Sequence, residues 1–107
     1  MAGRWFDVGE KSAVDANQPF PTEIDGLPIV VVSCGEGYYA IEDRCTHDGE
    51  AFAGAEVDTE SCQIVCPRHG ARFCLRTGEA LTPPAYEPVR TFTVRAENGR
   101  ISVELPE

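Results

Sequence analysis

The sequence predicts an all-β fold, a β-sandwich or small barrel, into which one loop-rich segment is inserted. Short runs of β-branched and aromatic residues recur along the chain, and turn sequences separate them. No stretch shows a helical period of useful length. Residues 43–85 differ from this pattern, because they hold four of the five cysteines, both histidines and several glycines.

Four strands are expected in the first part of the chain. Asp-Gly and Gly-x-Gly sequences between β-rich runs are typical of hairpin turns, so the runs on either side of each turn should pair. The expected strands are residues 4–8, 20–24, 27–33 and 38–42. Asp25-Gly26 is the turn between the second and third strands, and Gly35-Glu36-Gly37 is the turn between the third and fourth.

A final hairpin is expected at residues 89–96 and 100–105. The connecting Asn98-Gly99 pair is the strongest short hairpin signal, because both residues readily adopt the positive φ angles of a type I′ turn. Apolar residues alternate with polar ones along both strands, which predicts one buried face for each. Large aromatic residues are expected in the core: Trp5, Phe6 and Phe92.

The composition is that of one acidic domain. The chain has 107 residues, with 18 Asp and Glu against 9 Lys and Arg, and a formal charge of −9. This length fits a single domain over residues 1–107. Nucleic acid and anionic membrane surfaces are poor partners, because they are bound through clustered lysine and arginine. A partner with a basic docking surface is favoured.

We expect a cytoplasmic protein. Residues 1–10 show neither a long apolar stretch nor a small-residue cleavage site. The longest apolar run, residues 27–32, contains a proline and is far too short to span a bilayer. In a reducing cytosol, five cysteines are better explained as metal ligands or buried thiols than as a disulfide framework.

Two short sequences pair a cysteine with a histidine. They are Cys45-Thr46-His47 and Cys66-Pro67-Arg68-His69, and a hairpin expected within residues 55–65 would place them side by side. Gly49 and Gly70 follow these sequences, where the backbone must turn back. We therefore predict one metal centre with four ligands: Cys45, His47, Cys66 and His69.

Two thiolates and two imidazoles suit two kinds of metal centre. A structural zinc site usually has the order C-x₂₋₄-C, H-x₃₋₅-H, whereas here each loop carries one cysteine and one histidine. In one type of [2Fe–2S] cluster, two cysteines hold one iron and two histidines hold the other. Interleaved loops let each loop supply one ligand to each iron, so the order favours this cluster. No catalytic residue is predicted, because nothing provides an oxyanion site for a cysteine nucleophile.

The sequences around these ligands resemble those of the Rieske ferredoxins of bacterial non-haem iron (ring-hydroxylating) oxygenase systems. The resemblance rests on CTHDG and CPRHGARF, with LRTGEA and PPA after them, and it extends over nearly the whole chain. It implies a Rieske-type β-sandwich or barrel base, residues 1–42 and 86–107, and an inserted cluster-binding lobe, residues 43–85. It also implies that His47 and His69 lie at the exposed tip of the lobe, and that Pro83-Pro84 covers the flank of one [2Fe–2S] cluster.

Departures from the high-potential Rieske proteins of respiratory complexes narrow the subtype. Those proteins hold an extra cysteine in each ligand loop, where this chain has Glu50 and Arg68. They also place hydroxyl groups that bond to the sulfurs where this chain has Ala71 and Phe73. Fewer such hydrogen bonds stabilise the reduced cluster less, which lowers its potential. We expect the lower part of the Rieske range, which runs from about −150 to +300 mV.

The other three cysteines are expected to be buried, inert thiols. Cys34, Cys62 and Cys74 lie in or beside expected strands. A Cys62–Cys74 disulfide is disfavoured in the cytosol. Cys74 stands where this family usually has an acidic or small polar residue, so its role is open.

The resemblance implies an electron-transfer protein rather than an enzyme. Such a ferredoxin carries single electrons from a flavin- or iron–sulfur-containing reductase to a terminal non-haem iron oxygenase, and we expect a monomer. The alternative is a Rieske ferredoxin that uses the same centre to serve iron–sulfur cluster assembly or redox sensing. A structural zinc module, acting only as an interaction domain, is the third alternative.

Overall fold

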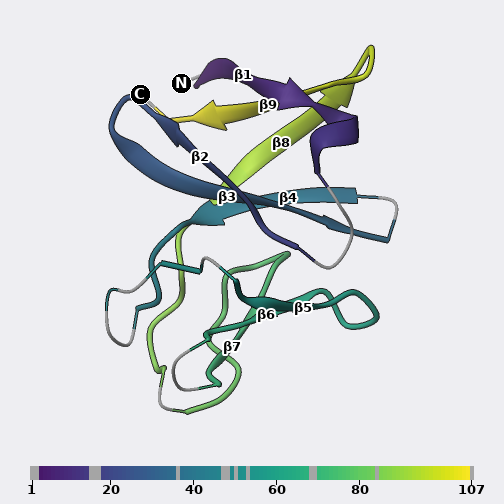
Figure 1. Ribbon diagram of the computed structural model, residues 1–107. Coiled ribbons are helices and arrows are strands. Elements are labelled where there is room, and N and C mark those ends of the chain that lie inside the picture. Colours follow the sequence, from purple (N-terminus) through teal and green to yellow (C-terminus); the bar gives the residue numbers. More distant parts are fainter. Residues whose placement is uncertain are drawn as a thin grey trace.

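Two antiparallel sheets make up the protein in the computed structural model (Figure 1). The structure describes residues 3–14, 18–35, 37–46, 49, 51–52, 54–67, 70–83 and 85–106. Within this part of the chain the large sheet has six strands, in the order β1 (Arg4–Glu10), β9 (Arg100–Leu105), β8 (Thr91–Glu97), β4 (Gly37–Glu42), β3 (Leu27–Cys34) and β2 (Phe20–Ile24). The small sheet has three, in the order β5 (Glu56–Asp58), β6 (Gln63–Val65) and β7 (Arg72–Cys74).

The expected all-β fold is confirmed. Of the described residues, only the 3₁₀ turn η1 (Lys11–Ala13), which follows β1, is helical. No helix in this described part is long and apolar enough to cross a membrane. In Figure 1 the large sheet occupies the top of the molecule and the small sheet, with its long loops, the bottom.

Both two-residue hairpins predicted from turn sequences are present. Asp25-Gly26 joins β2 to β3 with φ angles of 50° and 83°, and Asn98-Gly99 joins β8 to β9 with φ angles of 52° and 75°. Positive φ at both turn positions gives a twist that matches the strands on either side. These dipeptides therefore determine the register of their hairpins locally.

Other strand boundaries differ slightly from the expected ones. Strand β1 continues to Glu10, and β8 begins at Thr91. The expected hairpin within residues 55–65 is present as β5 and β6, each of three residues. Gly37 begins β4, whereas Glu36, the centre of the expected turn, lies outside the described residues.

Strand β3 is buried on both faces and divides the apolar interior in two. Residues 29–32 are fully buried. Because successive side chains of a strand point to opposite faces, Ile29 and Val31 lie in one apolar cluster and Val30 and Val32 in the other. A continuous apolar run without polar alternation suits a strand in this position.

The first cluster fills the interior of the large sheet. Ile24 of β2 and Val103 of β9 both belong to it, although their strands lie far apart in the strand order. The sheet therefore curls into a partial barrel. The second cluster lies between the two sheets, and it includes Cys45 and Cys66 beside Val30 and Val32.

Trp5 is not a core residue as expected. It is 37% exposed, and the guanidinium carbon of Arg95 lies 4.2 Å from the centre of its ring. Trp5 and Phe6 are neighbours on β1, so they point to opposite faces, and only Phe6 packs against the core. Phe92 is buried, as predicted.

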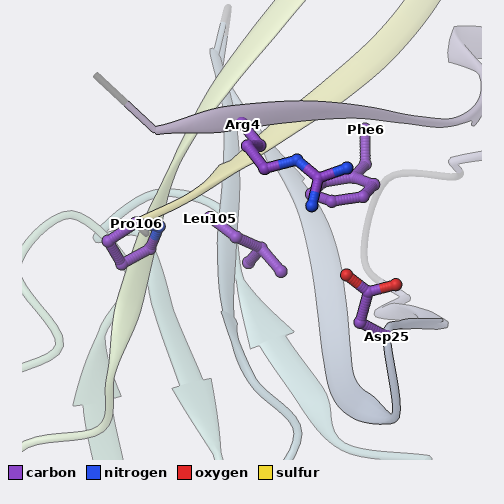
Figure 2. A pocket seen from close by; sticks show the side chains of 5 residues that line it. All are labelled: Arg4, Phe6, Asp25, Leu105 and Pro106. Carbon is purple, nitrogen blue, oxygen red and sulfur yellow. The ribbon is translucent and has the colours of Figure 1, made fainter. Parts of the chain in front are cut away.

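An open pocket of about 350 Å³ lies on the large sheet (Figure 2), and its lining residues are Arg4, Phe6, Asp25, Leu105 and Pro106. Figure 2 shows the guanidinium group of Arg4 over the ring of Phe6, while Asp25 faces them from the β2–β3 turn. All the described lining residues lie outside residues 43–85, the segment in which the metal centre is predicted.

Candidate metal centre

Both predicted ligand loops start from a buried cysteine. Cys45 is fully buried and Cys66 is 1% exposed. The N–H of Gly49 donates to the carbonyl oxygen of Cys45 at 2.8 Å, and the N–H of Gly70 donates to that of Cys66 at 2.9 Å. Both glycines have positive φ angles, 77° and 73°, which glycine adopts without steric cost. In both loops, therefore, the N–H of a glycine with positive φ donates to the carbonyl oxygen of the cysteine four positions earlier.

Asp43 closes the first loop. Its Oδ1 atom accepts a hydrogen bond from the N–H of Phe52 at 2.6 Å, and its own N–H donates to the carbonyl oxygen of Pro28 at 2.9 Å. This contact suits a loop whose described residues belong to no strand. Sequence reasoning missed Asp43, because its partner is a backbone amide nine positions away.

The second loop connects β6 to β7. The N–H of Cys66 donates to the carbonyl oxygen of Ala71 at 2.7 Å, so backbone pairing continues beyond the last strand residues. The loop is thus held at its base by the ladder of the small sheet, whereas the first loop is held by the Asp43 side chain.

The segment after β7 is hydrogen-bonded to the first ligand loop and to the strand residue that follows the second. The hydroxyl of Thr46, next to Cys45, donates to the carbonyl oxygen of Glu87 at 2.7 Å. The N–H of Arg72, just after the second loop, donates to the hydroxyl oxygen of Thr82 at 2.9 Å. Three loops are therefore joined into one unit. Pro84, half of the expected Pro83-Pro84 cover, lies outside the described residues.

Phe52 and Phe73 connect the first loop to β7 through their side chains. Their rings pack edge to face, with centroids 5.7 Å apart and planes at 87°, and both are fully buried. Phe52 belongs to the first loop and Phe73 to β7, so this contact ties the first loop to the small sheet. Aromatic pairs in this geometry add to the stability that burial provides.

The structure describes two of the four predicted ligands. Cys45 and Cys66 belong to the same buried cluster. His47 and His69 lie outside the described residues, together with Arg68 and Glu50. Over the described ranges alone, no three or more His, Cys, Asp or Glu side chains gather closely enough to hold a metal ion.

Comparison with known families decides which centre these loops belong to. The model of the Rieske [2Fe-2S] domain matches residues 4–93. That range contains both cysteine–histidine sequences and all or part of eight of the nine strands found in the described part of the chain. This chain belongs to the Rieske [2Fe–2S] domain family.

Curated relatives of this Rieske domain are ferredoxin subunits. The chain is 39% identical, over 85 residues, to the 3-phenylpropionate/cinnamic acid dioxygenase ferredoxin subunit of Escherichia coli (strain K12). The match covers 78% of this chain and 79% of that protein. The subunit of the same name from Shigella boydii serotype 4 (strain Sb227) is 38% identical over the same length.

Solved structures show the same fold. The ferredoxin of carbazole 1,9a-dioxygenase from Nocardioides aromaticivorans IC177 has a TM-score of 0.88 and 29% identity, over 96% of this chain and 98% of that one. A structure of the complex between reduced oxygenase and oxidised ferredoxin in carbazole 1,9a-dioxygenase matches with a TM-score of 0.86 and 28% identity, over 96% and 94% of the chains. Sphingomonas yanoikuyae B1 ferredoxin, 22% identical, shares the fold with a TM-score of 0.87 over 96% of this chain and all of that one.

The Rieske domain carries one [2Fe–2S] cluster, and the donors present fit it. Cys45 and Cys66 are buried, and neither forms a disulfide. Each begins a loop whose backbone is held by hydrogen bonds of its own. The chain therefore offers two thiols on the buried side of the loops, which is the sulfur set that such a cluster needs.

Cys34 and Cys62 correct an expectation for this Rieske domain. Both are buried, but they form a disulfide, with their Cα atoms 5.7 Å apart, rather than two inert thiols. Cys34 ends β3 and Cys62 lies between β5 and β6, so the bond joins the large sheet to the small sheet. The prediction failed because the usual redox state of a compartment does not indicate which cysteines meet in the fold.

Cys74 remains a thiol in this Rieske domain, but it is half-buried rather than buried. The hydroxyl of Thr77, and after it the backbone N–H groups of Thr77 and Arg76, hydrogen-bond to the sulfur and lower the pKa of the thiol below its ordinary value of 9.0. Cys74 is therefore more accessible and more readily ionised than the inert thiol expected.

Proposed function

We propose that this Rieske domain is a ferredoxin that carries single electrons from a reductase to a terminal non-haem iron oxygenase. The observation that carries the proposal is its 39% identity to a dioxygenase ferredoxin subunit, over more than three quarters of both chains. The carbazole dioxygenase ferredoxin, which is similar in fold and 28% identical, forms a complex with its oxygenase. Ferredoxin subunits transfer electrons and do not themselves transform the oxygenase substrate.

In this function Cys45 and Cys66 bind one iron, and His47 and His69 bind the other. Burial of both cysteines supports an inner position for the iron that they hold. The bound cluster supplies a one-electron redox couple. The side chains of Phe52 and Phe73, buried in the same apolar cluster as the two cysteines, exclude water from the cysteine side.

The proposed domain organisation follows from this division of roles. Residues 43–85 form the cluster-binding lobe, while residues 1–42 and 86–107 form the base. The small sheet and the two buried cysteines support the first assignment, and the curled large sheet supports the second. The base carries the lobe on one face of β3, through Val30 and Val32.

A low reduction potential is part of the proposal. Ala71 and Phe73 follow the second ligand loop, and both are fully buried. Neither side chain has a hydroxyl that could donate to a cluster sulfur, so the reduced cluster receives less stabilisation. We therefore propose a potential in the lower part of the range from about −150 to +300 mV.

The proposed partners are a flavin- or iron–sulfur-containing reductase and the oxygenase. The proposed ferredoxin is an acidic monomer in the cytoplasm, and each partner would bind it through a basic surface of its own. The formal charge of −9 supports this choice of surface and disfavours nucleic acid and membranes. The relatives named above favour an oxygenase as acceptor over iron–sulfur cluster assembly or redox sensing.

Two measurements on the purified holoprotein test the proposal. The first is its visible absorption and the EPR spectrum after reduction, and we expect a coloured protein with the signal of a Rieske cluster. A colourless sample that stays EPR-silent on reduction would contradict the cluster. The second is electron transfer from a ferredoxin reductase to a ring-hydroxylating oxygenase, followed as product formed. A reducible cluster that supports no turnover with any such oxygenase, yet donates electrons to cluster-assembly proteins, would contradict the function.

A further inference from the structure

We propose that Cys34 and Cys62 form a second redox site, which exchanges two electrons and controls how firmly the [2Fe–2S] cluster is retained. Its partner is a dithiol reductant, because a protein dithiol opens a disulfide by exchange. The inference needs the cluster, but it does not depend on the proposed electron partners.

The bond lies where the two sheets meet. Cys34 is the last residue of β3, and Cys62 lies in the turn between β5 and β6. Among the described strands, none of the large sheet pairs with one of the small sheet. Apolar packing, backbone hydrogen bonds of the adjoining loops and this disulfide therefore hold the small sheet in place.

The bond also encloses the first ligand loop. The chain from Cys34 to Cys62 contains Cys45, the whole first loop and strand β5. A cross-link restricts the motion of the segment that it closes, and the restriction disappears on reduction. One buried cluster contains the bonded cysteines and both proposed cysteine ligands: Cys34, Cys62, Cys45 and Cys66. Loosening the contact between the two sheets therefore also loosens the packing around the proposed ligands.

The site accommodates the reduced form as well as the oxidised one. The carbonyl oxygen of Thr59 lies 3.2 Å from Sγ of Cys34, which provides an acceptor for the thiol formed on reduction. The carbonyl oxygen of Cys62 accepts the N–H of Leu75 at 2.9 Å, so the backbone of this turn is held without the disulfide. Reduction can therefore be reversed without refolding the turn.

The dithiol reductant supplies all the electrons and protons of the exchange, and the cluster supplies none. A thiolate of the reductant attacks one sulfur, the Cys34–Cys62 bond breaks, and a mixed disulfide forms. The second thiol of the reductant then displaces the remaining sulfur, which leaves two protein thiols and an oxidised reductant. Two electrons and two protons pass to this chain. Because both cysteines are 2% exposed, the reductant attacks only when the sheet contact opens, which makes the exchange slow.

The test compares the oxidised holoprotein with the same protein after treatment with dithiothreitol and its removal under argon. Alkylation under denaturing conditions, read by mass spectrometry, should label three cysteines before reduction and all five after it, because five cysteines less the bonded pair leave three. Loss of visible absorption on warming should be at least about tenfold faster in the reduced sample.

Substitutions make the comparison specific. The double variant C34S/C62S should lose its cluster as fast as the reduced wild type and should not respond to dithiothreitol. Cys74→Ser is the matched control, since it removes a thiol on the neighbouring strand β7 and should keep the full response. If the double variant fails to fold, the reduced wild type still provides the comparison.

Three outcomes would overturn the inference. Labelling of all five cysteines in the oxidised protein would show that the bond does not form. A mapped Cys62–Cys74 bond would show that the pairing is wrong. Equal rates of cluster loss in oxidised and reduced protein would show that the bond has no influence on the cluster.

Discussion

The large and small sheets are stabilised in different ways. The large sheet pairs strands of five to eight residues around an interior of valine, isoleucine and phenylalanine side chains. The small sheet has strands of three residues, and its loops are held by side chains such as Asp43 and Thr46 and by one disulfide. The proposed metal centre thus belongs to the region with the least regular pairing. Functional loops are commonly found on such a region when a more stable framework positions them.

Removal of a proposed ligand should separate the two regions most clearly. Cys45→Ser replaces a buried sulfur ligand, and we expect loss of the visible absorption together with loss of order in the small sheet. The large sheet should stay folded, because its own core does not include this residue. Amide hydrogen exchange would show fast exchange in β5 to β7 and protection in β3, β8 and β9. The half-buried Cys74→Ser control should retain the cluster, and global unfolding of the Cys45 variant would contradict the comparison.

The aromatic contact should account for the next largest effect. Phe52→Ala removes a fully buried ring from its packing against Phe73, and a cost of about 3–5 kcal/mol in the free energy of unfolding is expected. Tyr86→Ala provides the control, since this side chain is 82% exposed and should contribute little to stability. Denaturant titration of both variants measures the difference. Equal costs would mean that the small sheet does not depend on this contact.

Gly78 tests the connection between the two regions. Its N–H donates to the carbonyl oxygen of Cys74 at 2.7 Å, and its own carbonyl oxygen accepts the N–H of Val89 at 2.8 Å. With a φ of 80° and the Val89 carbonyl against the position of a Cβ, Gly78→Ala should cost about 2–4 kcal/mol. The control Gly99→Ala has a φ of 75° but open space, and about 1–2 kcal/mol is expected. Thermal unfolding of both variants tests whether the close approach, rather than φ, makes the difference.

The smallest effect concerns two aspartates at the surface, the exposed Asp7 in the large sheet and the half-exposed Asp58 in the small sheet. The side-chain hydrogen bond from Arg100 lowers the pKa of Asp7 below 3.8, and that from Ser61 lowers the pKa of Asp58. A lowered pKa in the folded state stabilises the fold above the unfolded pKa, and this stabilisation is lost as the pH falls through the folded pKa. As the pH falls from about 5 to about 2, the free energy of unfolding should therefore decrease less in Asp7→Asn and in Asp58→Asn than in the wild type.

Urea titrations over that pH range measure this effect. Glu23→Gln on the exposed surface of β2 is a matched control, and its pH dependence should follow that of the wild type. An unchanged slope in either aspartate variant would show that the hydrogen bond to that carboxylate does not favour its ionised form.

Local sequence was sufficient for several features. Asp25-Gly26 and Asn98-Gly99 encode their own turns, because the required backbone angles depend on these two residues alone. Gly49 and Gly70 likewise mark the places where the ligand loops turn back. Two cysteine–histidine sequences on one short chain also identified the family, since that ligand order suits few metal centres.

Only the tertiary structure decided which distant groups meet. The Cys34–Cys62 bond joins residues 28 positions apart. The Asp43–Phe52 hydrogen bond closes the first loop, and the Thr46–Glu87 hydrogen bond joins this loop to the segment after β7; neither has a local signal of contact. The exposure of Trp5 was decided in the same way, by the face of β1 that the curled sheet leaves outside. The sequence by itself determined the hairpins and the glycine turns of the proposed ligand loops, because backbone angles and short spacings are local. Contacts between sheets depend on how the whole chain packs, and no short segment contains that information.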